Sequence, residues 1–148
     1  MNKRIYIAGP LFSQAELDFN LQVSSYLEKL GYSTYLAQRD GHLLADSVLD
    51  HEGRSRAMKK IFELDLAEIK KADILLFIFD GRVPDEGACV ELGIAYAMGK
   101  DCIGLKTDSR SLMAGLDNPL ILGALNNRVA GSVPELEGIL SGCAVSSR

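Results

Sequence analysis

The sequence predicts a doubly wound α/β fold, in which a mostly parallel sheet carries helices on both faces. Segments rich in β-forming residues alternate with segments of helical periodicity along the chain. The segment 73–79 is apolar after its first residue, which is typical of a strand buried on both faces in the middle of a parallel sheet. The 148 residues, 47% of them hydrophobic, suit one domain with a single core over 1–148.

The first half of the chain begins with a strand expected over 4–8, which ends at a Gly-Pro turn. The first helix is expected to begin at Ser13, because Glu16 three residues later completes a capping box, and to end at Gly31. A second strand is expected over 32–36. The polar stretch over 37–53 has no clear period and predicts a loop.

The second half opens with a helix over 54–71, whose expected apolar positions are Met58, Ile61, Phe62, Leu66 and Ile69. The strand over 73–79 leads through a loop over 80–85 into a helix that stops at Gly99. A strand over 102–105 and short helices over 118–125 and 134–140 complete the chain. Four strands separated by helices indicate a flavodoxin- or Rossmann-like sheet with right-handed crossovers.

Composition excludes several classes of protein. The net charge is -4 and the cations are scattered, so a nucleic-acid polymer is not expected as a partner. No apolar run is long enough to span a bilayer, and the N-terminus has no signal-peptide pattern. Three cysteines without CxxC spacing, and two distant histidines, His42 and His51, predict no metal site and a reduced, cytoplasmic protein.

Glu91 is the most informative residue, because it is the only charged residue between Gly87 and Gly99 in a run that predicts a buried helix. Gly87, Ala88 and Ala95 lie three or four residues away, and therefore on the same helix face. A carboxylate on a face of small residues suits contact with a substrate. An exposed stripe on an otherwise buried helix is equally compatible with the run alone.

The carboxyl ends of parallel strands are where such sheets bind ligands. The segments 9–13, 80–91 and 106–110 follow strands at that edge, with Tyr6 in the first strand and Asp65 in the helix before the third. Several carboxylates, one tyrosine and few cations are typical of glycosidic-bond chemistry. The chain has no GxGxxG, and Pro10 removes a backbone donor, so neither a dinucleotide site nor a phosphate cradle is predicted.

Three segments carry a resemblance that covers nearly the whole chain in the same order: IYIAGPLF at 5–12, FELDL at 62–66 and DGRVPDEGACVELG at 80–93. The chain resembles the nucleoside 2-deoxyribosyltransferase family. The stretch Asp-x-Gly-x-x-x-Glu-Leu-Gly at 85–93 is the most specific part of the resemblance.

The resemblance implies a role for each matching residue. Glu91 would be the nucleophile on the sugar C1′, and Tyr6 would orient it by a hydrogen bond. Asp85 would contact sugar hydroxyls and help with the base, and Asp65 would assist protonation of the base. Asn118 would reach the sugar, often in a neighbouring subunit's site.

The resemblance also implies the partners. Gly9, Phe12 and Gly87 are further candidate substrate contacts, the substrates are a nucleoside and a nucleobase, and no metal or other cofactor is needed. We expect a homo-oligomer, a dimer or higher. The family usually has Thr where this chain has Ala88, and many members place a C-terminal aromatic residue in the adjacent site, whereas the tail here has none.

Purely structural roles stay open for several of these residues. Asp85 and Asn118 are compatible with helix capping, Tyr6 with a place in the core, and Asp65 with a solvated helix face. Two other functions also stay open. One is hydrolysis of the N-glycosidic bond of a (deoxy)nucleoside or a nucleoside 5′-monophosphate, and the other is a non-catalytic nucleotide-binding module.

Overall fold

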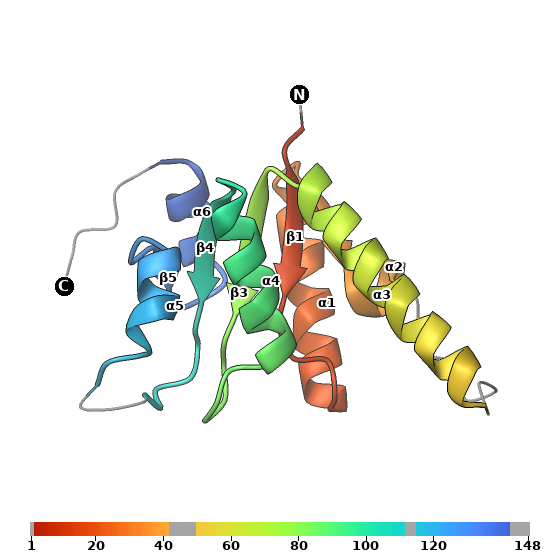
Figure 1. The fold of residues 1–148 in the computed structure, drawn as a ribbon. Helices are drawn as coiled ribbons and strands as arrows, with labels where there is room; N and C mark the ends of the chain where they lie inside the picture. The colour runs from red at the N-terminus through yellow and green to blue at the C-terminus, as the bar shows by residue number, and fades with distance from the viewer. Residues whose placement is uncertain (1, 42–49, 112–114, 143–148) are drawn as a thin grey trace.

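The chain folds around one sheet of five strands, all parallel, in the order β2-β1-β3-β4-β5 (Figure 1). The computed structural model describes residues 2–41, 50–111 and 115–142. The strands are β1 Arg4–Ala8, β2 Ser33–Leu36, β3 Ile74–Ile78, β4 Asp101–Leu105 and β5 Val129–Ala130. The helices are α1 Gln14–Lys29, α2 Ala37–Asp40, α3 His51–Lys71, α4 Glu86–Ala97, α5 Pro119–Ala124 and α6 Glu135–Leu140.

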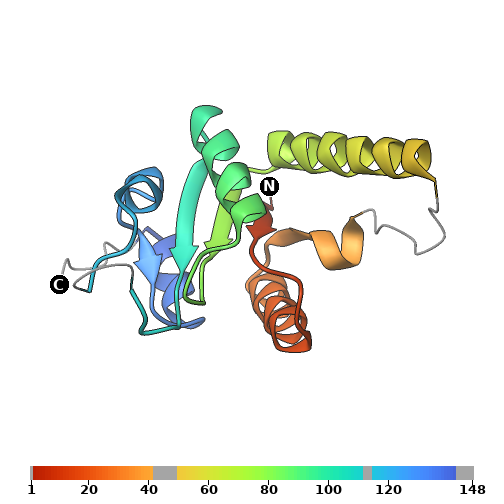
Figure 2. The same cartoon turned by 60° about the horizontal axis from the view of Figure 1, so that its bottom comes forward.

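Helices cover both faces of the sheet, as the sequence predicted. Helices α3, α4 and α5 lie on one face and α1 and α6 on the other (Figure 2). The alternation of side chains along a strand divides the core in the same way. In β1, Tyr6 and Ala8 belong to the apolar cluster under α3, α4 and α5, whereas Ile5 and Ile7 pack with α1 and α6. Every residue of β3 is buried, as expected for the central strand.

The four predicted strands and the capping box at Ser13 are confirmed. The fifth strand was missed, because its two residues are too few to show a period. The loop expected over 37–53 is wrong in part, since α2 begins at Ala37 and α3 begins at His51 with Asp50 as its N-cap. The part of this stretch that includes His42 lies outside the described residues.

Two helices are less buried than the sequence predicted. Met58 and Phe62 of α3 are 58% and 57% exposed, because the first half of that helix extends beyond the sheet (Figure 2). Helix α4 buries one side through Ala88, Leu92 and Ala95. Val90 and Tyr96 on its other side are exposed, so the prediction that this run forms a buried helix holds for one side of the helix only.

No helix in the described ranges is long and apolar enough to cross a membrane. Cys89 and Cys102 are free thiols, and Cys143 lies outside the described residues. Within the same part of the chain no three His, Cys, Asp or Glu side chains come together as a possible metal site. The cytoplasmic location stays a prediction.

Gly104 in β4 marks the tightest packing between the sheet and α5. A Cβ atom there would lie 2.8 Å from Leu125 Cδ1 and 3.0 Å from Phe79 Cε1. We therefore predict that Gly104→Ala lowers the free energy of unfolding by about 1–3 kcal/mol through overpacking, measured by urea denaturation. Gly123→Ala in α5 is the control, because its Cβ would meet open space and helix propensity favours alanine. Equal stability of Gly104→Ala and the parent chain would contradict this account of the packing.

Candidate active site

The candidate site lies at the carboxyl edge of the sheet, between β1 and β3. In the strand order observed here, the crossovers from these two strands leave on opposite faces, which opens a crevice at the strand ends. Gly9 closes this end of β1 against β3, because a Cβ atom there would lie 3.0 Å from Ile78 Cβ. Only glycine therefore lets the chain turn so close to the neighbouring strand.

A pocket of about 300 Å³ occupies this crevice on the side of α3 and α4. Its walls come from the loop after β1, from the segment at α2, and from α3 and α4. The residues that line it are Ile7, Gly9, Leu11, Phe12, Ala37, Gly41, Ile61, Asp65, Asp85, Gly87, Ala88 and Glu91. Among these lining residues the ionisable ones are all carboxylic acids, so the pocket suits a neutral or cationic ligand.

Glu91 is held in this pocket by Tyr6. The Tyr6 hydroxyl donates a hydrogen bond of 2.7 Å to Glu91 Oε1 across the gap between β1 and α4. Tyr6 itself is 1% exposed, so its ring is core and its hydroxyl serves the carboxylate. The helix face of Gly87, Ala88 and Ala95 lets Glu91 approach the sheet, and Gly87 leaves room beside it in the pocket.

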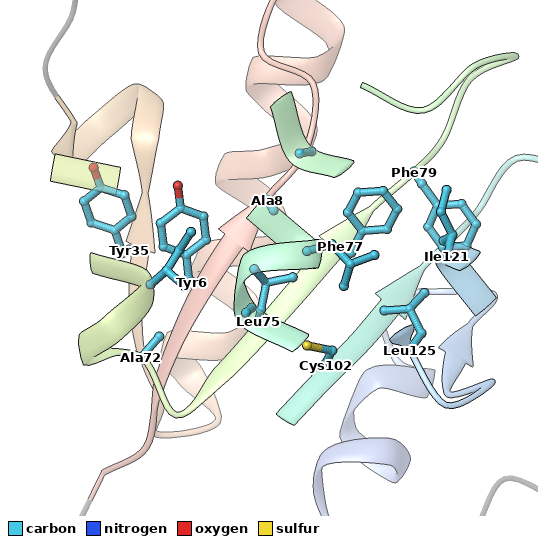
Figure 3. Close-up of a cluster of buried hydrophobic side chains, with 14 residues drawn as sticks. Tyr6, Ala8, Tyr35, Ala72, Leu75, Phe77, Phe79, Cys102, Ile121 and Leu125 are labelled. Carbon is cyan, nitrogen blue, oxygen red and sulfur yellow. The ribbon is translucent and has the colours of Figure 1, made fainter. Parts of the chain in front are cut away.

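Asp65 has a tyrosine partner of its own. The Tyr35 hydroxyl donates a hydrogen bond of 3.2 Å to Asp65 Oδ1. The rings of Tyr35 and Tyr6 stack with centroids 5.1 Å apart, because these residues are paired in the β1–β2 ladder. Figure 3 shows the two rings side by side with their hydroxyl oxygens on the same side.

Burial changes the acidity of both carboxyl groups. Removal from water raises the pKa of Glu91 to about 7, which the Tyr6 hydrogen bond partly offsets, and the nearby Asp65 and Asp85 add to the increase. Burial likewise raises the pKa of Asp65, against the lowering effect of the Tyr35 and Tyr6 hydroxyls. Two carboxyl groups at the same pocket therefore hold their protons more tightly than ordinary side chains do.

Asp85 is both the N-cap of α4 and a residue that lines the pocket. Its Oδ2 atom accepts a hydrogen bond of 2.7 Å from the Ala88 N–H, as an N-cap of α4 does. The same side chain lines the pocket. Gly87 fits beside it, because a Cβ atom there would lie 3.2 Å from that oxygen.

The structure brings most of the predicted site residues together, but Asn118 is apart from them. Gly9, Phe12, Asp65, Asp85, Gly87 and Glu91 line one pocket, with Tyr6 bonded to Glu91. Asn118 is exposed, caps α5 through a 2.9 Å bond from the Leu120 N–H, and is not among the residues that line the pocket of its own chain.

Sequence reasoning missed Tyr35. The signal that could have found it is the register of the first two strands, since parallel pairing sets Tyr35 beside Tyr6 with both side chains on one face.

Arg39, near the pocket wall formed by α2, is not free for a ligand. Its guanidinium donates to Glu28, Thr34 and Asp40, and so fastens α2, which forms a pocket wall, to α1 and β2.

A second hollow, of about 400 Å³, lies at the same edge on the side of α1. Two carboxylates in this hollow, Asp80 and Asp108, accept hydrogen bonds from backbone N–H groups. Asp80 accepts from the N–H groups of Thr107 and Asp108 at 2.6 and 2.9 Å, and Asp108 accepts from the Gly81 N–H at 3.0 Å. These bonds join the loops that follow β3 and β4, and they explain the acids without a ligand.

Comparison with known proteins agrees with this architecture. The fold, with an acidic pocket at its switch point, defines a doubly wound, flavodoxin-like α/β domain. The family model for nucleoside 2-deoxyribosyltransferase matches residues 5–145, so the chain belongs to that family of enzymes. No curated protein matches the chain significantly.

Solved structures share the fold over most of their length. A conserved protein from Enterococcus faecalis V583 has 27% identity and a TM-score of 0.78, covering 96% of this chain and 99% of its own. A 2-deoxyribosyltransferase from Bacillus psychrosaccharolyticus has 25% identity and a TM-score of 0.73, covering 90% of each chain. A CMP N-glycosidase from Clostridium botulinum has 19% identity and a TM-score of 0.56, covering 94% and 99%, and shows likeness of fold alone.

Ionisation of the partly buried and desolvated Glu91 is expected to cost stability. Its pKa of about 7 lies above the ordinary value of 4.5, so the folded chain binds this proton more tightly than the unfolded chain. Stability present below about pH 4.5 is therefore lost as the pH rises through about 7. We predict that Glu91→Gln is more stable than the parent chain above that pH, by up to about 3 kcal/mol, and that the difference vanishes in mild acid.

Urea denaturation between about pH 4.5 and about pH 8.5 measures this difference. The matched control is Glu86→Gln, which neutralises an exposed carboxylate in the first turn of the same helix. A difference for Glu91→Gln that is independent of pH would show that Glu91 is not buried as described.

Proposed function

We propose that the chain transfers 2-deoxyribose between nucleobases by double displacement, with Glu91 as the nucleophile. The observation that carries the proposal is the partly buried Glu91 carboxylate, which accepts a 2.7 Å hydrogen bond from a tyrosine in a pocket shared with Asp65 and Asp85. A pocket of about 300 Å³ is within the size range of sites for small molecules. The membership of the chain in the family supports the same reaction class.

In the first half of the reaction, Glu91 attacks C1′ of a 2′-deoxynucleoside from the face opposite the base. The C1′–N bond breaks through an oxocarbenium-like transition state, and its electron pair goes to the base nitrogen. Asp65, which lines the same pocket and whose pKa is raised by burial, supplies the proton to the departing base. The product of this step is a deoxyribosyl ester on Glu91.

In the second half, an acceptor base attacks the same carbon, gives its N–H proton to the Asp65 carboxylate left by the first half, and releases the Glu91 carboxylate. Two inversions give net retention of configuration at C1′. The Tyr6 hydroxyl fixes the Glu91 rotamer and stabilises its charge in the free enzyme and after release of the sugar. Asp85 contacts the sugar hydroxyls from the helix N-terminus, where Gly87 leaves space for the sugar.

Hydrolysis is the second candidate, because it differs only in the second half, where water replaces the acceptor base. The observation that favours it is Ala88 on the nucleophile's own helix face, where the family usually carries Thr. Loss of that hydroxyl removes one polar group beside Glu91. The assay below separates the two reactions directly.

A homo-oligomer is part of the proposal. Met58 and Phe62 on α3, and Leu116 and Leu120 near the start of α5, are more than half exposed. Asn118 lies between the latter two and away from the pocket of its own chain. We propose that these exposed side chains, at the two ends of the sheet (Figure 1), pack against other copies of the chain and bring Asn118 to the sugar in a neighbouring site.

The decisive experiment incubates the protein with deoxyinosine, with and without adenine, and separates the products by chromatography. We expect deoxyadenosine to form, and Glu91→Gln to lose at least about a thousandfold in rate, because no ester can form without the carboxylate. Glu86→Gln, an exposed carboxylate of the same helix, should keep the parent rate.

Each other result has a distinct meaning. Free hypoxanthine without deoxyadenosine would replace the transferase by the hydrolase. Turnover by Glu91→Gln close to that of the parent chain would remove Glu91 as nucleophile. The absence of any product from a panel of deoxynucleosides would favour the non-catalytic module.

The pocket also predicts the charge of the substrate. Its ionisable lining residues are Asp65, Asp85 and Glu91, and the N–H groups of Phe12 and Ser13 beside it already donate to Glu16 at 3.0 and 2.7 Å. A phosphate would meet repulsion and find these donors engaged. We predict that kcat/KM for a deoxynucleoside exceeds that for its 5′-monophosphate by roughly a hundredfold or more, and a ratio near one in a competition assay would contradict this.

A further inference from the structure

Tyr35 occupies a position where a phenylalanine would fill the core equally well. Its side chain is 2% exposed, and its ring stacks on Tyr6 with an angle of 25° between the ring planes. A hydroxyl buried without a partner costs free energy, so the presence of the hydroxyl needs an explanation. The Tyr35 hydroxyl donates a hydrogen bond to Asp65 Oδ1.

Helix α3 fixes the backbone position of Asp65 but not the rotamer of its side chain. It projects from α3 one turn after Ile61, and both residues line the pocket. A hydroxyl donor on one carboxyl oxygen fixes the plane of the group and leaves the other oxygen for the proton and the ligand. Tyr35 reaches it from the neighbouring strand β2, which is a rigid support.

We propose that Tyr35 is a positioning residue, which holds the Asp65 carboxyl group and sets how readily it gives up its proton to the departing base. The inference rests on the proposed function, in which Asp65 protonates the base. As the C1′–N bond breaks, the bond pair moves to the base nitrogen, the Asp65 proton follows it, and a carboxylate is left. The hydrogen bond from Tyr35 strengthens at that moment, because its acceptor becomes charged.

The groups around Asp65 support this role. Tyr6 from β1 acts on it in the same direction as Tyr35, and Glu91 from α4 shares the pocket. Burial raises the pKa of Tyr35 most, and the negative charges of Asp65, of Glu68 on the same helix and of Asp40 in α2 raise it further. Tyr35 therefore stays a neutral donor throughout the reaction, which is what positioning of an acid requires.

The test removes the Tyr35 hydroxyl and keeps its ring. In Tyr35→Phe we expect the pKa of Asp65 to rise, measured as the 13C shift of its carboxyl carbon across a pH titration and assigned with Asp65→Asn. The alkaline limb of the kcat profile should move upward in parallel. The value of kcat at neutral pH should fall about tenfold, with KM changed much less.

Tyr32→Phe is the matched control, because Tyr32 immediately precedes the same strand and packs on the opposite face of the sheet. It should leave both the titration and the rate unchanged. If Tyr35→Phe proves unstable, 3,5-difluorotyrosine at position 35 serves instead. That side chain keeps the ring and the bond with a more acidic donor, so it should lower the pKa of Asp65.

The outcomes distinguish this inference from the proposed function. Active parent enzyme with an unchanged Asp65 titration and an unchanged alkaline limb in Tyr35→Phe would overturn the role of Tyr35 alone. A parent chain without activity on any nucleoside would overturn the proposed function, whereas the titration would still decide whether Tyr35 controls Asp65. A fall in kcat without movement of the titration would mean that the hydroxyl acts only through packing, and would also overturn it.

Discussion

The hydrogen bond between Tyr6 and Glu91 joins the two parts of the fold on which the site depends. Tyr6 belongs to the strand beside the switch point, and Glu91 belongs to the helix that follows the central strand. The carboxylate can stay in this partly buried position, beside two other acids, only because a hydrogen-bond donor meets it there. Small residues on that face of α4 let the helix come close enough for the bond to form.

This arrangement sets stability against function. A methionine or leucine at position 91 would fill the crevice without a desolvation cost, and the chain instead places an acid there whose pKa burial raises to about 7. Asp65 repeats the pattern with Tyr35 as its donor. Two tyrosine–carboxyl pairs stacked side by side are a costly way to build a core, which is understandable if both acids exchange protons or bonds with a ligand.

Much of the fold follows from local signals, and the rest depends on contacts between distant segments. The four longer strands and the capped start of α1 follow from periodicity and from Ser13 with Glu16. Strand β5 has two residues and helix α2 has four. Both depend on contacts with neighbouring elements, so no periodic pattern in the sequence could predict them. The apolar positions of α3 predicted burial, but the sequence does not show which element would cover them. Met58 and Phe62 are exposed in the structure.

The site divides in the same way. Glu91 was recognisable because it stands alone among apolar and small residues. The expected strand edge placed Tyr6, Asp65 and the segment with Asp85 near it, and the resemblance to a family gave each of them a role. Tyr35 was missed, because its place in the site depends on the register of two strands and on a hydrogen bond to a residue thirty positions away in the sequence. The distance of Asn118 from the pocket is likewise a property of the folded chain, and its role stays a prediction.

Helix α2 shows how the width of the pocket can be controlled from outside it. Four residues are too few to hold a helical turn by themselves, and no side chain caps the start of this one. The order of the turn is supplied by the planar fork of Arg39, which contacts two other elements at once and no pocket atom. A lysine offers a single point of charge and could not span the same acceptors. Variation at this position would therefore loosen or reset one wall of the crevice, and change which ligands fit, while every carboxyl group of the site stayed in place.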